Sequence, residues 1–223
     1  MRKGVRRGKN IPAKLKMKVI LVNGSPRPAG CTYTALSEVA SSLNKNGIET
    51  EIFQIGRMAV SGCLACHGCR ELNRCVIEDD CVNSLAAKLM NSDGMVIGSP
   101  VYYAGPNGAL CAVLDRVFFS TQKEVYANKP ASAVVSCRRS GGTASLDRLF
   151  KYFSIANMTI VGSSYWNIVH GNTPEEVGKD LEGLQVMRRL GENMAFILKN
   201  LEAGSGIIEK TEPEQHIGTN FIR

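Results

Sequence analysis

The chain has 223 residues, of which 44% are hydrophobic, and a formal net charge of +7 at pH 7. This length suits one globular domain, and the absence of an apolar run near the roughly 20 residues that cross a bilayer excludes a membrane-spanning class. Eight of the 27 Lys and Arg residues precede residue 19, so the remainder is nearly neutral. Because nucleic-acid-binding domains carry a basic excess on the folded body, we expect neither a nucleic acid nor a membrane as partner.

The basic segment at 1–16 is expected to be a flexible extension of the folded domain. It is also compatible with a short targeting or nucleic-acid-binding segment, or with residues upstream of a second start at Met17. It lacks the apolar core of a secretory signal, so we expect a cytoplasmic protein. In that reducing compartment, clustered cysteines are more often metal ligands or catalytic groups than disulfides.

Strand and helix patterns alternate along the first half of the chain. Short apolar, β-rich runs predict strands, and apolar residues on one helical face predict helices. In chain order we expect a strand at 18–24, a helix at 31–47, a strand at 48–55, a cysteine-rich loop at 61–81, a helix at 82–93 and a strand at 94–100.

The same alternation continues in the second half. The last helix is expected to open with a proline and two acidic residues, as helix starts prefer. In chain order we expect a helix at 106–120, a strand at 130–137, a helix at 142–158, a strand at 159–166 and a long helix at 174–200. The folded domain would then span 17–202, with a C-terminal tail at 203–223.

Alternating strands and helices indicate an α/β fold, a doubly wound parallel sheet with helices on both faces. Such sheets bind ligands beyond the carboxyl ends of their strands, where the strand order reverses. The loops after the first, third and fourth strands are therefore the expected binding segments: NGSPRPAGCT, SPVYYAGPNG and SCRRSGGT.

The first of these loops has the chemistry of an anion site. Its glycines let backbone amides turn toward an anion, and the following helix N-terminus adds partial positive charge. Ser25 and Thr32 offer hydroxyls, and Arg27 offers a fixed cationic fork. The loop matches neither the Walker pattern nor GxGxxG. Taken alone, it is also compatible with an ordinary Gly/Pro turn.

The other two loops are weaker signals individually. Tyr102 and Tyr103 could cover a flat ring, but tyrosines at strand ends often only pack on a rim. The loop with Arg138 and Arg139 is also compatible with a charged surface turn. All three loops are expected at one edge of the sheet, and together they favour a ligand-binding site there.

Four cysteines in the loop at 61–81 follow the spacing C-x2-C-x2-C-x5-C: Cys63, Cys66, Cys69 and Cys75. Four thiolates can bind a [4Fe–4S] cluster, and zinc accepts the same ligands. Free or redox-active thiols are the third alternative. We expect His67 to be a spacer in this loop and Asp79 and Asp80 to cap the helix that begins near Cys81.

The segments VILVNGSPRPAGCTYTAL, DGMVIGSPVYYAGPNGALCAVLDR and SCRRSGGT resemble the flavin-binding loops of flavodoxin-fold NAD(P)H-dependent FMN reductases. With CLACHGCRELNRCVIEDD after the second strand, the chain resembles the iron–sulfur flavoprotein family within that superfamily. The resemblance implies a flavodoxin-like, five-stranded sheet of order 2-1-3-4-5 with a cysteine-rich insertion after strand 2.

The resemblance also implies cofactors and their residues. FMN phosphate would be held by Ser25, Arg27 and Thr32, in a loop and helix start that include Cys31, Tyr33 and Thr34. The isoalloxazine would be lined by Pro100, Val101, Tyr102 and Tyr103, and the pocket completed by Cys137, Arg138, Arg139, Gly141 and Gly142. A [4Fe–4S] cluster would be bound by Cys63, Cys66, Cys69 and Cys75. No catalytic side chain is expected, since the flavin carries the chemistry.

The implied function is an oxidoreductase that passes electrons between a cluster, or NAD(P)H, and a small acceptor such as oxygen, peroxide or a quinone. Ferredoxin or NAD(P)H would be the electron donor, and the assembly a homodimer or homotetramer in which the cluster of one subunit nears the FMN of another. The first alternative is a cluster-free NAD(P)H-dependent FMN or quinone reductase. A second is a zinc-stapled binding protein with a degenerate flavin pocket.

Overall fold

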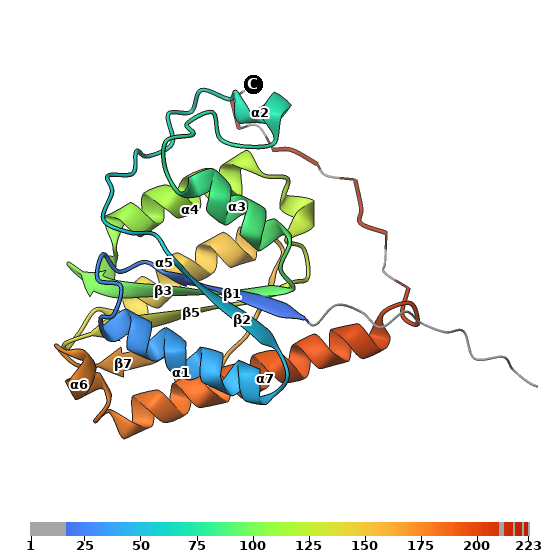
Figure 1. Ribbon diagram of the computed structural model, residues 1–223. Coiled ribbons are helices and arrows are strands. Elements are labelled where there is room, and N and C mark those ends of the chain that lie inside the picture. Colours follow the sequence, from blue (N-terminus) through green and yellow to red (C-terminus); the bar gives the residue numbers. More distant parts are fainter. Residues whose placement is uncertain (1–16, 210–211, 216, 220, 223) are drawn as a thin grey trace, which may run out of the picture.

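The computed structural model describes residues 17–209, 212–215, 217–219 and 221–222, so the predicted extension at 1–16 lies outside the described residues. A parallel sheet of order β2-β1-β3-β5-β6 runs through its centre (Figure 1). Its strands are β1 (Lys18–Asn23), β2 (Glu49–Gln54), β3 (Gly94–Tyr102), β5 (Pro130–Cys137) and β6 (Thr159–Ile160). Two short strands lie off this path: β4 (Gly105–Pro106) pairs antiparallel with β3, and β7 (Ile168–His170) pairs with β5.

Helices cover both faces of the sheet (Figure 1). One face carries α1 (Cys31–Lys45) and α7 (Leu181–Gly204), and the other carries α3 (Val82–Met90), α4 (Gly108–Ser120) and α5 (Gly142–Ile155). The remaining helical segments are short: α2 (Cys69–Leu72), α6 (Pro174–Val177) and a 3-10 turn at Lys123–Val125. This arrangement confirms the predicted doubly wound α/β fold.

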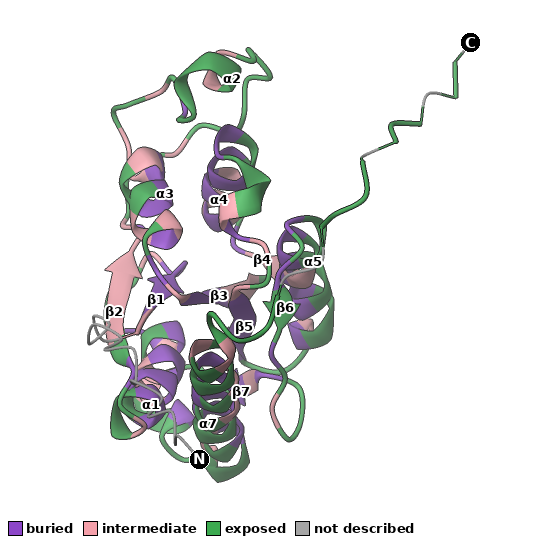
Figure 2. Ribbon diagram, turned by 90° about the vertical axis from the view of Figure 1, so that its right-hand side faces the viewer, coloured by how far each residue is buried: buried purple, intermediate pink, exposed green. Residues whose placement is uncertain are grey.

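Alternation along the central strands builds a separate core on each face. Val19 and Leu21 of β1 join the core against α1 and α7, whereas Ile20 and Val22 join the core against α3, α4 and α5. Successive side chains of a strand point to opposite faces, so an apolar run without alternation is the pattern of a strand buried on both sides. Figure 2 shows this as buried residues between the two helical layers.

Two predicted elements are interrupted in the structure. Of the strand expected at 159–166 only β6 forms, because the chain then loops outward, and β7 begins beyond the predicted range. The Asn167 side chain fills the gap by donating to Ser132 Oγ and to the Ala133 carbonyl, each at 3.0 Å. The helix expected at 174–200 is likewise divided into α6 and α7, since Asp180 caps a new helix by accepting from Gly183 N at 2.9 Å.

The helices of the described residues do not include one that is both long and apolar enough to cross a membrane.

Candidate functional site

The loop after β1 is braced from the strand on each side. Gly24 N donates to Gly98 O on β3 at 2.8 Å, and a β-carbon at Gly24 would lie 2.6 Å from that same oxygen. On the other side Gln54 of β2 donates to Ser25 O at 2.6 Å. Ser25 Oγ in turn accepts from Arg27 N at 3.1 Å. The loop is therefore held in one shape by the sheet below it, and the close approach at Gly24 requires glycine.

This loop leads into a helix start with free donors. Gly30 occupies the N-cap of α1, no side chain of the described residues caps the helix there, and its first turn holds no acidic residue. The first backbone N–H groups of a helix lack partners inside the helix and carry partial positive charge. Arg27, three residues earlier, is exposed. The start of α1 thus has the donors and charge that suit a phosphate.

A buried pair of hydroxyls joins α1 to β5. Thr32 Oγ1 and Ser136 Oγ lie 2.8 Å apart, and both side chains are buried. Beside them, Cys31 Sγ contacts Gly171 O at 3.8 Å, and Gly171 N donates to Cys137 O at 3.0 Å. The segment after β7 therefore also reaches this edge, a contribution that the sequence did not indicate.

The loop after β3 turns back as a tight hairpin. Val101 pairs with Pro106 and Tyr102 with Gly105, so Tyr103 and Ala104 form the turn, with φ of 49° and 60°. Two-residue hairpins favour positive φ at both turn positions, although residues other than glycine, asparagine and aspartate seldom adopt it. The turn leaves both tyrosine side chains exposed.

Asn107, which the sequence reasoning missed, ties this hairpin to the first loop. Its Nδ2 donates to Gly24 O at 2.7 Å, and its Oδ1 caps α4 by accepting from Ala109 N at 2.9 Å. Its backbone N–H donates to Ser99 Oγ at 2.9 Å. The Asn-Gly pair before a helix was the available signal, because asparagine is a preferred N-cap residue.

The third loop packs directly against the hairpin. Gly141 has a φ of +87°, and a β-carbon there would lie 2.6 Å from Ala104 Cα and 3.0 Å from Val101 Cγ1. Glycine is needed at this position both for its conformation and for the contact. Arg138 and Arg139 on the same loop are exposed.

The predicted flavin residues thus gather on three touching loops at one sheet edge. Ser25, Thr32, Cys137 and Gly142 are buried; Cys31, Thr34, Pro100, Val101 and Gly141 are half-buried; Arg27, Tyr33, Tyr102, Tyr103, Arg138 and Arg139 are exposed. A braced helix start for an anion beside exposed aromatic groups fits a flavin mononucleotide in its donor set.

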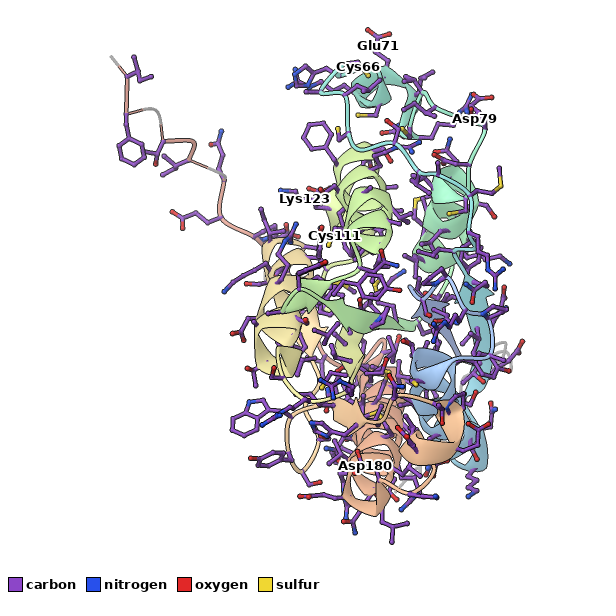
Figure 3. All side chains as sticks on the ribbon, turned by 90° about the vertical axis from the view of Figure 1, so that its left-hand side faces the viewer. Cys66, Glu71, Asp79, Cys111, Lys123 and Asp180 are labelled. Atoms are coloured by element: carbon purple, nitrogen blue, oxygen red, sulfur yellow. The ribbon has the colours of Figure 1, made fainter. Side chains whose placement is uncertain are left out.

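The cysteine-rich loop lies elsewhere. It leaves the carboxyl edge after β2 and crosses over α3 and α4, on the outer side of that helical layer (Figure 1). Figure 3 looks onto the carboxyl edge of the strands: Cys66 and Glu71 lie at one end of the molecule, and Asp180, at the start of α7, lies at the other.

One cavity brings the four predicted cysteine ligands together. Cys63, Cys66, Cys69 and Cys75 all line it, with Arg116 and Phe119 of α4. Cys63 and Cys66 are exposed, Cys69 is half-buried and Cys75 is buried. No three Cys, His, Asp or Glu side chains of the described residues lie close enough to bind one metal ion.

The backbone of this loop is unusual. Ala65 and His67, which flank Cys66, have φ of 50° and 59°, and Gly68 returns to φ −59°. A change from left-handed to right-handed backbone turns successive N–H groups to one side, a concavity found at many anion and iron–sulfur sites. The His67 ring lies 6.1 Å from that of Phe119 and lines the cavity. Four thiols around a concave loop fit a cluster in their donor set.

The buried pair of Arg116 and Asp80 beneath the loop was not predicted. The Arg116 side chain is 1% exposed and the Asp80 side chain 6%, and the two form an ion pair. Asp80 Oδ1 also accepts from the N–H of Val82, the first residue of α3, at 3.0 Å, although Cys81 and not Asp80 is the N-cap residue. Burial lowers the pKa of Arg116, but hydrogen bonds from it to Asp80 and Cys75 outweigh burial and raise the pKa overall. The partners are far apart in sequence, so local patterns carried no signal for them.

The four cysteines outside the C-x2-C-x2-C-x5-C spacing are half-buried or buried, and so are partly shielded from solvent. Burial raises the pKa of Cys31, of Cys81 and of Cys111, and it also raises the pKa of Cys137. Raised values keep these thiols protonated, and protonated thiols are poor nucleophiles and poor metal ligands. Cys111 is half-buried in α4.

Comparison with known proteins gives a family and several relatives for this chain. The NADPH-dependent FMN reductase family matches residues 17–173. An iron–sulfur flavoprotein of Methanocaldococcus jannaschii is 32% identical over 193 residues, covering 82% of this chain and 98% of the relative. An iron–sulfur flavoprotein of Methanosarcina thermophila is 25% identical over 190 residues, covering 83% of this chain and 97% of that protein.

Solved structures share the fold at low sequence identity. RosB, solved with bound 8-demethyl-8-formylriboflavin-5′-phosphate, has a TM-score of 0.65 at 14% identity, covering 93% of this chain and 94% of RosB. A flavodoxin from the domain Archaea has a TM-score of 0.56 at 14% identity, covering 82% of this chain and 99% of the flavodoxin. The chain therefore belongs to the NADPH-dependent FMN reductase family and, within it, to the iron–sulfur flavoproteins, flavodoxin-like oxidoreductases that work with FMN.

Proposed function

We propose that this protein passes electrons between a [4Fe–4S] cluster, filled by ferredoxin or another donor, and FMN, which delivers them to a small acceptor such as oxygen, peroxide or a quinone. The observation that carries the proposal is the cavity that Cys63, Cys66, Cys69 and Cys75 line together. In a cubane cluster each cysteine binds a different iron, so the ligands surround a cavity instead of meeting at one ion.

The flavin would be held by the chain's own polar groups. The N–H groups at the start of α1, with Ser25, Arg27 and Thr32, would bind the phosphate, because the start of α1 is uncapped and bears no acidic side chain among the described residues. The hairpin at 100–103 and the loop at 137–142 would flank the ring, and their contact at Gly141 supports a common pocket. Bound FMN exchanges electrons singly or in pairs, whereas a cluster exchanges them singly.

A homodimer or homotetramer completes the proposal. The cysteine loop lies over α3 and α4, away from the flavin loops of the same chain (Figure 1). A second subunit could bring its flavin loops to this cysteine loop, which would shorten the path between the two cofactors. Exposed apolar side chains on and beside the loop, Leu64, Leu72 and Phe119, support a surface that is covered in the assembly.

The test is anaerobic purification followed by assays of FMN, iron, sulfide and zinc per chain. Yellow-brown protein with about four irons and four sulfides per FMN is expected. Plain yellow protein without iron, even after anaerobic reconstitution with iron and sulfide, would contradict the cluster. It would favour the second candidate, a cluster-free NAD(P)H-dependent FMN or quinone reductase, which the family match supports.

A further inference from the structure

Arg116 joins α4 to the cysteine loop through hydrogen bonds from all three nitrogens of its guanidinium. Nε donates to Cys75 Sγ at 3.2 Å, Nη1 to Ser61 O at 3.2 Å and Nη2 to Ile77 O at 3.2 Å. Both terminal nitrogens also donate to the Asp80 carboxylate. A buried arginine with all of its groups bonded has one orientation, so the direction of its Nε–H toward the sulfur is fixed.

The sulfur of Cys75 must be the acceptor in this contact. A guanidinium has five N–H donors and no acceptor, and it stays charged in proteins. A thiolate accepts such a bond far better than a thiol does, because charge strengthens the bond. Metal ligation requires that same thiolate. The contact therefore suits Cys75 as a ligand, because the guanidinium donates to the sulfur that would bind iron.

The backbone of Cys75 is fixed as firmly as its sulfur. Asn83 of α3 accepts from Cys75 N at 2.9 Å and donates to Cys75 O at 2.9 Å. Cys63 and Cys66, by contrast, lie on the exposed part of the loop. Cys75 is thus anchored by both α3 and α4, whereas Cys69 meets α4 only through the Phe119 carbonyl, at 3.9 Å.

We propose that Arg116 is a positioning residue that holds Cys75 as a cluster ligand and raises the reduction potential of the bound cluster through its Nε–H. This inference rests on the proposed function, since it requires a cluster at these cysteines. Hydrogen bonds to cluster sulfurs and nearby charge both set cluster potentials. Reduction adds one electron and increases the negative charge on the sulfurs, so an N–H donor stabilises the reduced form more than the oxidised form.

The experiment compares Arg116→Gln with the full-length protein, purified and titrated anaerobically. Iron and sulfide content and the cluster midpoint potential are measured by spectroelectrochemistry and by electron paramagnetic resonance. FMN content and circular dichroism report on the rest of the fold. We expect the equilibrium constant for reduction of the cluster to fall about tenfold in Arg116→Gln, which lowers the midpoint potential by about 59 mV for one electron. Loss of the cluster while FMN stays bound is the other expected result.

The matched control is Arg74→Gln. Arg74 precedes Cys75, but its side chain is 50% exposed and pairs with Glu78. Its removal takes away a positive charge in the loop but no bond to a sulfur, and exposure and the pairing with Glu78 screen that charge, so the midpoint should move far less than in Arg116→Gln. An unchanged midpoint in Arg116→Gln, or equal shifts in the two variants, would overturn the proposal.

Removing Arg116 also strands the buried carboxylate of Asp80, which could unfold the loop. The double variant Arg116→Gln with Asp80→Asn removes both charges and leaves amides that can hydrogen-bond. A folded double variant with a lowered midpoint supports the proposal, and one with the wild-type midpoint refutes it. Unfolding of both variants would limit Arg116 to a role in stability and would also refute it. Wild-type protein that binds no iron would instead contradict the proposed function itself.

Discussion

Thr32 and Ser136 share a buried hydrogen bond of 2.8 Å between their hydroxyl oxygens, although they lie 104 residues apart. A hydroxyl has one donor and two acceptor positions. If Ser136 donates to Thr32, the Thr32 proton is free to bond a phosphate at the start of α1. Ser136 on β5 would then fix the direction in which the Thr32 hydroxyl donates to the phosphate.

This relationship separates stability from binding. Thr32→Val and Ser136→Ala should each lower the free energy of unfolding by about 1 kcal/mol, because each removes one hydroxyl of the pair and leaves the other buried hydroxyl without its hydrogen bond. FMN affinity should fall clearly in Thr32→Val and only slightly in Ser136→Ala. Urea denaturation and fluorescence titration with FMN measure the two effects. Equal FMN affinities in the two variants would contradict the assigned role of Thr32.

Arg27 should matter for FMN and not for the fold. It is exposed, so Arg27→Ala should change the free energy of unfolding by less than about 0.5 kcal/mol. Loss of a charge-assisted bond to phosphate removes about 1.5–3 kcal/mol, which is roughly a tenfold loss of affinity or more. Arg189→Ala, on the exposed side of α7, is the control. Unchanged FMN affinity in Arg27→Ala would contradict the assignment of the loop at 23–30 to the phosphate site.

The sheet and the three loops could be predicted from the sequence, because strand burial is visible in local composition, whereas the strand order came from the family resemblance. The predicted boundaries were wrong where a side chain, and not the backbone, makes the hydrogen bond to a strand or to a helix start. Residues 162–164 leave the sheet, and the Asn167 side chain donates to the Ala133 carbonyl in their place. Helix α6 ends at Gly178, and Asp180 caps the start of α7. The Gly and Ser run and the Gly-Lys-Asp run were signals for both breaks.

Long-range side-chain contacts could not be predicted from one sequence. Arg116 meets Asp80 and Cys75 only because α4 packs under the cysteine loop. Asn107 meets Gly24 only because β1 and β3 are neighbours in the sheet. Spacing identified the cysteines, but their common cavity depends on these tertiary contacts.

Asn107 should couple the stability of α4 to FMN binding. Asn107→Ala removes both the helix cap and the bond to Gly24 O, and should cost about 1–3 kcal/mol of unfolding free energy. Asn107→Ser keeps a cap acceptor but cannot reach Gly24, so it should retain most of the stability and still bind FMN more weakly. Chemical denaturation and FMN titration distinguish the two variants. Wild-type FMN affinity in Asn107→Ser would show that the bond to Gly24 does not shape the loop.

Gly141 and Gly47 form a matched pair of glycines with positive φ. Gly47 follows α1 with a φ of +80° and nothing within 4 Å of a built β-carbon. Gly47→Ala should therefore cost only the left-handed conformation, about 1–2 kcal/mol. Gly141→Ala adds a contact of 2.6 Å with the backbone of Ala104, so it should be less stable than Gly47→Ala and should also lose FMN. Thermal denaturation with and without FMN is the measurement, and equal losses in both variants would contradict the close packing.

Cys75 and Cys81 test which thiol is the fourth cluster ligand. Cys75 lines the cavity with the other three cysteines and accepts from Arg116, whereas Cys81 is half-buried at the start of α3. Cys75→Ser should lose most of the iron and sulfide, since a serine hydroxyl is a poor substitute for a thiolate ligand. Cys81→Ser should keep both, and each variant should keep FMN, because the flavin loops lie at the strand edge. Anaerobic iron, sulfide and FMN assays give the answer: iron lost from Cys81→Ser and kept by Cys75→Ser would move the fourth ligand to Cys81 and leave the contact between Arg116 and Cys75 without a role at the cluster.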